Sequence, residues 1–473
     1  MSSELPNGWK MVIGLEVHTE LATETKLFSG SANHFGGEPN TQLDPVSLGL
    51  PGSLPVLNER AVELAIRIGL ALNCVVQRSV FARKNYFYPD QPKDFQISQY
   101  ELPINGEGHL DLPDGSTVGI TRAHLEEDTG KSSHMGSGGG RIHDAEYTLV
   151  DYNRAGVPLL EIVSEPDMRT AEQAKVYVTE LRSILVAVRA SDGKMEEGSM
   201  RVDANVSVRR SDNDPFGTRC EIKNVNSIRS LGRAIDFEAR RQIDLLEAGE
   251  SIRQETRHWN EDEGRTVTLR SKEEATDYRY FPEPDLVELD PDPAWIEEIR
   301  AALPMLPRER RLQLTARTGA SIEASSLIVE RGLDEMVLAA LDAGGDPGRL
   351  ITHAQQLSDD RAVGLDPSAF AELSTMESSG AISATQAKTV LARMVDTGEQ
   401  PSAIAADLGF EAMASNELET IVDGLIAAHA DEWAKFVAGE QKVMGFFVGA
   451  VMKATGGKAD GKAVSAILNQ RRG

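Results

Sequence analysis

The chain has little cysteine and no long apolar run. Its 473 residues include two cysteines, Cys74 and Cys220, which excludes a disulfide framework and any Cys-x-x-Cys zinc site. The longest apolar run, residues 443–452, is far shorter than the about 20 residues that span a bilayer. The first residues carry neither the basic segment nor the apolar core of a secretory signal. We therefore expect a cytoplasmic protein that does not enter a membrane.

Positive charge is also scarce. The formal net charge of −25 argues against binding DNA, or any other duplex nucleic acid, over the whole surface. The carboxyl-terminal segment reverses this sign, with six basic residues from Lys442 onward against the single acid Asp460. The net charge therefore does not exclude local contacts between this segment and nucleic-acid phosphates.

Sequence motifs for nucleophilic and P-loop chemistry are missing. Neither Gly-x-Ser-x-Gly nor Gly-x-x-x-x-Gly-Lys-Ser/Thr occurs. Cys74 ends an apolar stretch and Cys220 points to the apolar face of its predicted strand, so both thiols are expected to pack as small hydrophobic groups. A covalent enzyme intermediate is not expected.

Four segments in the first half alternate between apolar and polar residues, which is the pattern of a half-buried β-strand. They are residues 12–21, 120–130, 199–209 and 219–223. A solvated face explains any one of them, but one antiparallel sheet would gather all four polar faces on one surface. Clustered carboxylates repel one another and favour a hard cation such as Mg²⁺, which commonly brings phosphates with it. The pattern predicts a metal–nucleotide site.

The remaining organisation is α+β up to about residue 290 and helical beyond it. Helices are predicted from Glu59 to Cys74 and over residues 171–189, the second capped by Thr170. After proline clusters at 290–293 and 303–307 the strand pattern disappears. We expect an α+β domain over 1–294, an all-α domain over 295–409 and a small all-α tail over 410–473.

One helix of the second half carries clear start and stop signals. Ser383-Ala-Thr-Gln386 is a capping box, and Gly398 and Pro401 close the helix that it opens.

In the first half, Lys84 and Lys93 flank an aromatic, proline-stiffened segment. That segment is either a rigid surface turn or a pair of cations over an anionic or ammonia-bearing cavity.

Eight motifs in order give the chain a specific resemblance. It resembles the B subunits of the tRNA-dependent amidotransferases, which act on Glu-tRNA(Gln) and Asp-tRNA(Asn). The motifs are VIGLEVHTEL, KNYFYPDQPKDFQISQY, ITRAHLEEDTGK, DYNRAGVPLLEIVSEPD, EGSMRVDANVSVR, EIKNVNS, DYRYFPEPDL and GGKADGKAVSAILNQ. The resemblance implies an antiparallel-sheet cradle related to glutamine synthetase, an all-α middle domain and a YqeY-like helical tail.

The resemblance also implies a ligase chemistry. ATP phosphorylates the side-chain carboxylate of the misacylated tRNA, and ammonia then displaces the phosphate to leave the amide of Gln-tRNA(Gln) or Asn-tRNA(Asn). Phosphoryl transfer needs Mg²⁺ and a cation against the developing charge. The implied catalytic and metal-site residues are Glu16, His18, Glu126, Glu127, Asp203 and Glu221. The implied ATP- or substrate-binding residues are Asn153, Arg154, Arg201, Asn205 and Lys223.

Partners follow from the same resemblance. Ammonia would come from an amidase-like A subunit, with Lys84 and Lys93 at the mouth of its tunnel, and a small C subunit would complete a heterotrimer. Misacylated tRNA would be gripped by basic residues of the tail, namely Lys453, Lys458, Lys462, Arg471 and Arg472. Two other readings stay open: a free-standing Mg-dependent carboxylate–amine ligase that uses no RNA, and a non-enzymatic RNA-binding scaffold.

Overall fold

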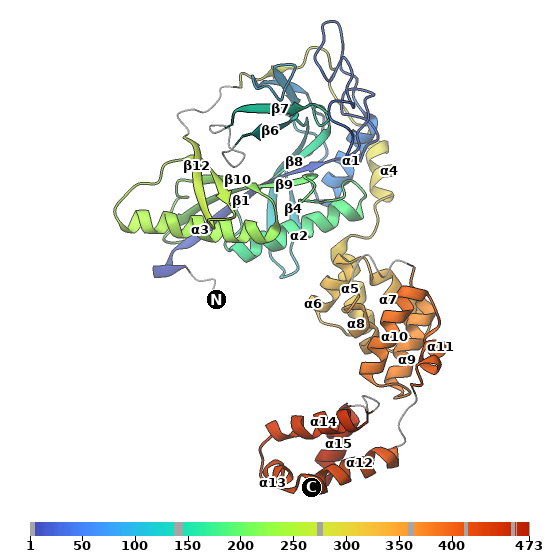
Figure 1. Ribbon diagram of the computed structural model, residues 1–473. Helices are drawn as coiled ribbons and strands as arrows, with labels where there is room; N and C mark the ends of the chain where they lie inside the picture. Colours follow the sequence, from blue (N-terminus) through green and yellow to red (C-terminus); the bar gives the residue numbers. More distant parts are fainter. Residues whose placement is uncertain are drawn as a thin grey trace. The chain divides into compact units, whose positions relative to one another are not determined.

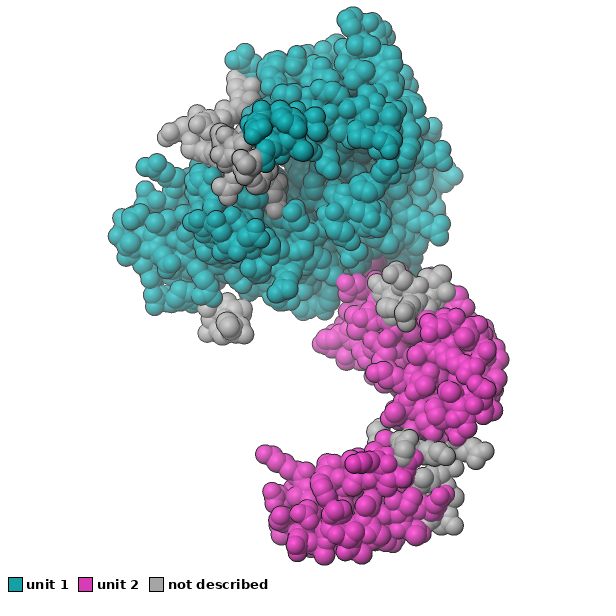
Figure 2. Space-filling view, viewed as in Figure 1, with its two compact units in different colours: residues 1–306 teal, residues 307–473 magenta. Residues whose placement is uncertain are grey.

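The computed structural model describes residues 5–136, 145–271, 278–357, 364–410, 415–455, 459 and 461–472. It divides into two compact units, residues 1–306 and 307–473, which are coloured separately in Figure 2. The first unit is α+β and the second is helical in its described residues, as the sequence predicts.

An eight-stranded sheet organises the first unit, in the order β12-β11-β10-β9-β1-β8-β5-β4 (Figure 1). Its strands are β1 (Lys10–Glu20), β4 (Gly108–Asp111), β5 (Thr117–Glu127), β8 (Pro158–Ser164), β9 (Met200–Arg209), β10 (Cys220–Val225), β11 (Glu255–Asn260) and β12 (Arg265–Ser271). The four alternating segments of the sequence form β1, β5, β9 and β10, which confirms them as strands. Neighbouring strands are antiparallel except β10 and β11, which run parallel.

Helices cover the apolar face of this sheet. They are α1 (Glu59–Ala71), α2 (Ala171–Ala187) and α3 (Ile228–Glu247), while α4 (Pro293–Ala301) packs against α1 and a short 3₁₀ turn, η1 (Pro6–Gly8), precedes β1. Helices α2 and α3 pack together, and α3 contacts β9, β10 and β12. Helix α3 also connects β10 to β11, because parallel neighbours need a crossover rather than a hairpin. Thr170 caps α2 as predicted, since its hydroxyl accepts from the Gln173 N–H at 3.0 Å.

The apolar side of each central strand is buried. Ile13, Leu15 and Val17 of β1 are at most 1% exposed and belong to one hydrophobic core with residues of α1, α2 and α3. Since side chains alternate along a strand, Glu16 and His18 point to the opposite face. The free thiols of Cys74 and Cys220 are buried, as predicted.

Two small sheets complete the first unit. One has the order β13-β2-β3, with β2 (Ala82–Asn85), β3 (Phe95–Ser98) and β13 (Phe281–Pro282). Strand β3 contacts β5 and thereby brings this sheet beside the large one. The other pairs β6 (Lys131–Met135) with β7 (Tyr147–Asp151).

The second unit contains two hydrophobic cores. The first involves α5 (Pro307–Thr318), α6 (Ile322–Glu330), α7 (Asp334–Asp342), α8 (Pro347–Ala354), α9 (Pro367–Ser378), α10 (Ala384–Thr397) and α11 (Pro401–Asp407). The second involves α12 (Ser415–Ala428), α13 (Ala430–Val437), α14 (Lys442–Ala454) and α15 (Gly461–Arg472). The capping box of Ser383 and Gln386 is present, and Gly398 ends α10 with a left-handed φ of 71°. Within the described chain, no helix is both long and apolar enough to cross a membrane.

The main division of the chain lies between Leu306 and Pro307. The boundary at 294 expected from the sequence falls inside α4 instead. Ile299 is buried in the core of the first unit and Leu303 and Leu306 pack against it, so the segment after the proline cluster still belongs to the sheet domain. A separate tail from about residue 410 stays a proposal, supported by the second helical core.

Candidate active site

Acids and histidines from four strands meet on the polar face of the large sheet. Pairing sets Glu16 opposite Asp203 across β1 and β9, and His18 opposite Glu161 across β1 and β8. His124 of β5 also lies opposite Glu161. Two sets of ligand atoms result, each within 4.8 Å of one another and sharing His18: Glu16, His18 and Asp203, and His18, Glu126 and Glu161.

The distances around His18 suit a cation at either nitrogen of its ring. Its Nδ1 lies 3.8 Å from Glu126 Oε1 and 3.9 Å from Glu161 Oε2, and its Nε2 lies 3.8 Å from Asp203 Oδ2. These separations are too long for hydrogen bonds. They match the spacing of two ligand atoms that each lie about 2.0–2.6 Å from one metal ion.

Negative charge is concentrated around Glu16. Burial, followed by the nearby charges of Glu161 and Glu221, raises the pKa of the Glu16 carboxyl above its usual range. Asn205 donates a hydrogen bond to Glu16 Oε1 at 3.0 Å. A cation would relieve this repulsion, and the donors are mostly carboxylate oxygens, which Mg²⁺ prefers. The residues present therefore fit a divalent metal ion.

Positive groups border the site on two sides. On the β10 side, Lys223 donates to Asp203 Oδ2 at 2.7 Å and lies 3.0 Å from Glu221 Oε1. Burial opposes the charge of Lys223, but Asp203 and Glu221 outweigh it and raise its pKa. Lys223 thus holds two of the predicted acids in place.

On the β5 side, the positive group is Lys84 of β2, whose Nζ lies 4.8 Å from the centre of the Tyr278 ring. Glu126 is buried, yet its pKa is lowered by the neighbouring His124, whose Nε2 lies 3.8 Å from Glu126 Oε2, and by the charge of Lys84. The structure thus brings the predicted Lys84 beside the predicted Glu126, from different sheets.

A cavity of 720 Å³ adjoins the end of β1, and Glu20, Arg154 and Arg201 are among its lining residues. Arg201 donates to the buried Asp128 at 2.7 Å, and Arg154 Nε donates to the carbonyl oxygen of Thr129 at 2.9 Å. Burial and the neighbouring Asp128 raise the pKa of Glu20 to about 7, against the opposing charge of Arg201. The guanidinium groups of both arginines can therefore bind an anion in this cavity, which is large enough for a nucleotide.

Asn153 also lines this cavity, but its amide is already engaged. Its Oδ1 accepts from the Thr41 and Gln42 N–H groups at 2.8 and 2.9 Å, and its Nδ2 donates to the Glu38 carbonyl at 2.7 Å. Asn153 therefore holds a loop that forms part of the cavity wall.

Two predicted residues lie away from the ligand groups. Glu127 and Lys93 form a buried ion pair with each other, and Glu127 Oε1 also accepts from the Ile97 N–H at 2.9 Å. Lys93 lines a separate cavity of 180 Å³, together with Arg83 and Glu283. Within the described residues, neither Glu127 nor Glu221 belongs to a ligand group.

The basic residues of the tail differ in their surroundings. Arg471 forms ion pairs at 2.9 Å with both Glu419 and Asp423 of α12. The Arg472 guanidinium lies 5.0 Å from the centre of the Phe436 ring. Lys453 is exposed near the end of α14. Lys458 and the side chain of Lys462 lie outside the described residues.

Sequence reasoning gave no role to His124, Glu161 and Asp128, and it placed Glu20 on the polar face of its strand without a role. His124 alternates in step with Glu126 along β5, so the period that identified Glu126 could have found it. Glu161 is the only charged residue in β8, a strand that is otherwise mostly buried and apolar. A lone acid in such a strand is a usable signal, because burying a charge without a partner is costly.

Comparisons with known proteins match most of the chain. The family of the GatB/GatE catalytic domain matches residues 11–297, and the GatB domain family matches residues 348–471. The chain is 47% identical to the B subunit of the aspartyl/glutamyl-tRNA(Asn/Gln) amidotransferase of Nocardia farcinica, over 97% of this chain and 95% of the relative. It is 47% identical to the B subunit from Salinispora tropica and 44% identical to that from Thermosynechococcus vestitus, each over 98% of this chain and at least 96% of the relative. A match of this extent, in both halves of the chain, establishes that it belongs to the family of B subunits of tRNA-dependent amidotransferases.

Proposed function

We propose that the polar face of the large sheet phosphorylates the side-chain carboxylate of misacylated Glu-tRNA(Gln) or Asp-tRNA(Asn), using ATP, and then converts it to the amide. The observation that carries this proposal is the convergence of Glu16, His18 and Asp203 beside a cavity with two arginines. A carboxylate is a poor acyl donor because its oxygen leaves badly, and phosphorylation supplies a better leaving group.

Mg²⁺ is the proposed cofactor. Either Glu16, His18 and Asp203 or His18, Glu126 and Glu161 would hold an ion, since a neutral imidazole has one free lone pair and His18 serves one set at a time. An ion held by these residues would supply positive charge against the negative charge that develops during phosphoryl transfer. Asn205 orients Glu16, and Lys223 together with Glu221 orients Asp203. Glu127, paired with Lys93, would support the neighbouring strand rather than the metal.

Arg154 and Arg201 are proposed to hold the phosphates of ATP or the substrate carboxylate. Both guanidinium groups lie beside Asp128, at 3.5 Å and 2.7 Å, which fixes their orientation before substrate arrives. Planar guanidinium groups bind phosphate and carboxylate through paired hydrogen bonds. Asn153 contributes by holding the loop that forms part of this wall.

Amidation needs ammonia, which we propose comes from an A subunit of the amidase type. The ammonia lone pair attacks the acyl carbon, the carbon–oxygen bond to the phosphate breaks, and the nitrogen loses a proton. Lys84, beside Glu126, and Lys93, at the 180 Å³ cavity, are the residues proposed to line the entry route. A C subunit would complete the heterotrimer.

The helical tail is proposed to bind the body of the tRNA. Lys453, Lys458, Lys462 and Arg472 supply positive charge to a chain that is otherwise strongly acidic, while Arg471, paired with Glu419 and Asp423, would hold the tail together for this contact. Contacts to phosphates position a nucleic acid without reading its sequence. Work on aminoacyl-tRNA makes the cytoplasm the proposed location.

The test is ATP hydrolysis by the assembled complex, with and without misacylated tRNA. Hydrolysis that rises sharply with Glu-tRNA(Gln) or Asp-tRNA(Asn), and fails with the correctly charged tRNA, supports the proposal. Full glutamine-dependent activity in the isolated chain would favour a free-standing ligase. Tight tRNA binding without any ATP turnover would favour a scaffold.

A further inference from the structure

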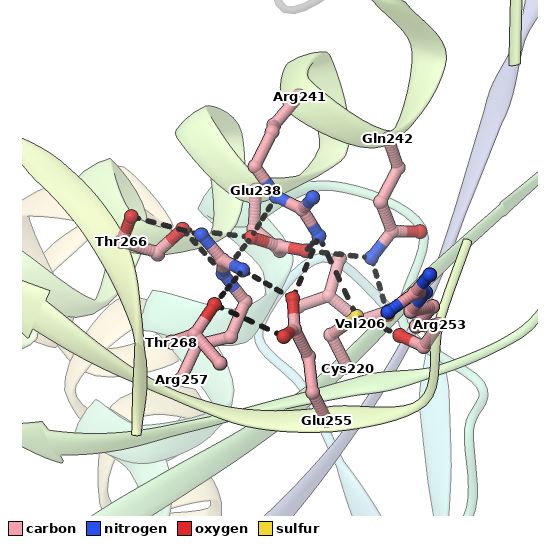
Figure 3. Close-up of polar contacts among 10 residues, drawn as sticks. All are labelled: Val206, Cys220, Glu238, Arg241, Gln242, Arg253, Glu255, Arg257, Thr266 and Thr268. Atoms are coloured by element: carbon pink, nitrogen blue, oxygen red, sulfur yellow. Dashed lines mark hydrogen bonds and ion pairs between the residues drawn. The ribbon is translucent and has the colours of Figure 1, made fainter. Parts of the chain in front are cut away.

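Behind β10 and β11, on the face opposite the site, four charged side chains form a buried network (Figure 3). They are Glu238 and Arg241 of α3 and Glu255 and Arg257 of β11. Glu238 is fully buried, and Arg257 is 7% exposed. Two acids and two arginines balance one another, so no net charge is left in the low-dielectric interior.

Arg257 is the member that fixes the position of β11. It donates to Thr266 Oγ1 at 2.9 Å and to Thr268 Oγ1 at 3.0 Å on β12, and its Nε lies 3.1 Å from Glu238 Oε2. Glu238 also accepts from Gln242 at 2.9 Å, and Gln242 donates to the Val206 carbonyl of β9 at 3.0 Å. The network therefore ties β11 to α3, to β12 and, through Gln242, to β9.

The residue before Arg257 faces the opposite way, because side chains alternate along a strand. Thr256 lies opposite Glu221 in the parallel pair of β11 and β10. Its hydroxyl donates to Glu221 Oε2 at 2.9 Å. The other oxygen of Glu221 lies 3.0 Å from Lys223 Nζ, and Lys223 donates to Asp203 Oδ2 at 2.7 Å.

We infer that Thr256 is a positioning residue for the reaction, because its hydroxyl fixes Glu221, which fixes Lys223 and through it the ligand Asp203. This inference rests on the proposed function of the site. Thr256 contacts no proposed ligand of the metal directly, and β11 lies two strands away from β9. The buried network fixes β11 from the face opposite the site. It thereby also fixes the position of the Thr256 hydroxyl on the face that carries the site.

The experiment uses Thr256→Val in the complete heterotrimer, since valine keeps the shape and removes only the hydroxyl. Phosphorylation of misacylated tRNA is measured across a series of Mg²⁺ concentrations. Groups that orient metal ligands typically contribute about 10- to 100-fold to metal affinity or activity. We expect the Mg²⁺ concentration for half-maximal rate to rise by about 10-fold, and Thr256→Ser to restore it.

Thr121→Val is the matched control. Thr121 Oγ1 donates to Glu165 Oε1 at 2.7 Å, an equivalent threonine–glutamate bond at an exposed position on β5. This variant should keep the wild-type Mg²⁺ dependence. The Tm of each variant is recorded, so that a loss of folding is separated from a shift in Mg²⁺ dependence.

Glu16→Gln separates the inference from the function on which it rests. If Glu16→Gln abolishes phosphorylation while Thr256→Val matches the wild type at every Mg²⁺ concentration, the role of Thr256 is refuted and the site stands. If Glu16→Gln phosphorylates normally, the proposed function itself fails. A shift shared equally by Thr121→Val also overturns the inference.

Discussion

Asn205 donates a hydrogen bond to Glu16 across the two central strands of the sheet, with 3.0 Å between Asn205 Nδ2 and Glu16 Oε1. The bond ties one carboxylate oxygen to a neutral donor in a neighbourhood that is otherwise rich in acids. It leaves the second oxygen available to a cation. The orientation of Glu16 therefore depends on the amide of Asn205. This residue lies two residues along β9 from Asp203, which is directly opposite Glu16.

Asn205→Ala should lower the rate of phosphorylation of misacylated tRNA by about 10- to 100-fold, since it removes the group that orients a metal ligand. Asn205→Asp has nearly the same volume but places another carboxylate beside Glu16, so its loss should be larger. The measurement is single-turnover phosphorylation at saturating ATP. Equal rates in both variants would contradict an electrostatic role for this amide.

Glu16→Gln should stabilise the metal-free protein, with a pH dependence of defined sign. The pKa of Glu16 is raised in the folded state above its ordinary value of 4.5, so the folded protein holds this proton more tightly than the unfolded chain does. The stability of the wild type therefore falls as pH rises from about 4.5 through the folded-state pKa. Glu16→Gln has no carboxyl group to ionise at this position, so its stability does not fall for this reason.

Thermal unfolding at several pH values tests this. The Tm advantage of Glu16→Gln should be absent at low pH and grow with rising pH. Added Mg²⁺ should raise the Tm of the wild type more than that of the variant, because only a ligand that binds the folded state stabilises it. A Tm advantage that shrinks with rising pH would contradict the assignment.

Lys84→Ala should impair glutamine-dependent amidation more than phosphorylation. Lys84 lies between the Tyr278 ring and the buried Glu126, at the side of the site where β2 approaches. The comparison is the rate of amide formation with glutamine, with ammonium salts, and the rate of ATP consumption, in one preparation. If all three rates fall together, Lys84 serves the acids of the metal site rather than the path of ammonia.

The tail offers a direct contrast between Lys453 and Arg471. Lys453→Ala should weaken tRNA binding and lower its salt dependence by roughly one unit of slope, as expected for one lost phosphate contact. Arg471→Ala should instead lower the thermal stability of the tail, because Arg471 joins α15 to Glu419 and Asp423 of α12. Binding across a salt series and unfolding of the same variants distinguish these outcomes. An unchanged slope in Lys453→Ala would count against a phosphate contact there.

Glu238→Gln should destabilise the sheet domain by about 3–5 kcal/mol, the usual effect of removing one partner from a buried ion network. Trp259 of β11, which is 4% exposed, reports the unfolding of this region by fluorescence. The matched control is Glu63→Gln, whose pairs with Arg60 and Arg67 lie on the surface of α1. Its effect should stay within about 1 kcal/mol. Equal effects would mean that the buried network is no more important than a surface pair.

Much of the fold could be predicted because periodicity reports which way a side chain points. Alternation identifies β1, β5, β9 and β10 and places Glu16, His18 and Asp203 on one face, as the structure has them. Capping residues locate the start of α2 and of α10. Both signals depend only on residues that are close together in the sequence. Local hydrogen bonding decides whether such residues form a strand or the start of a helix.

The order of strands could not be predicted in the same way. Alternation does not state which strand is the neighbour of another, so it gives no sign of the parallel pair of β10 and β11 or of the contact between Thr256 and Glu221. Adjacency in the sequence groups Glu127 with Glu126. The two point to opposite faces, and Glu127 instead meets Lys93, which lies in the turn between β2 and β3.

The central position of β1 has a consequence for how the chain is made. Strand β1 is synthesised long before its two partners, since Glu20 pairs with Leu159 and Lys10 pairs with Arg209. At about 5–20 residues per second, synthesis of the segment up to Leu159 takes on the order of ten seconds. Meanwhile a strand with one apolar face and two unpaired edges is exposed to aggregation. Until β8 and β9 are made, β1 is therefore a segment that a cellular chaperone should bind.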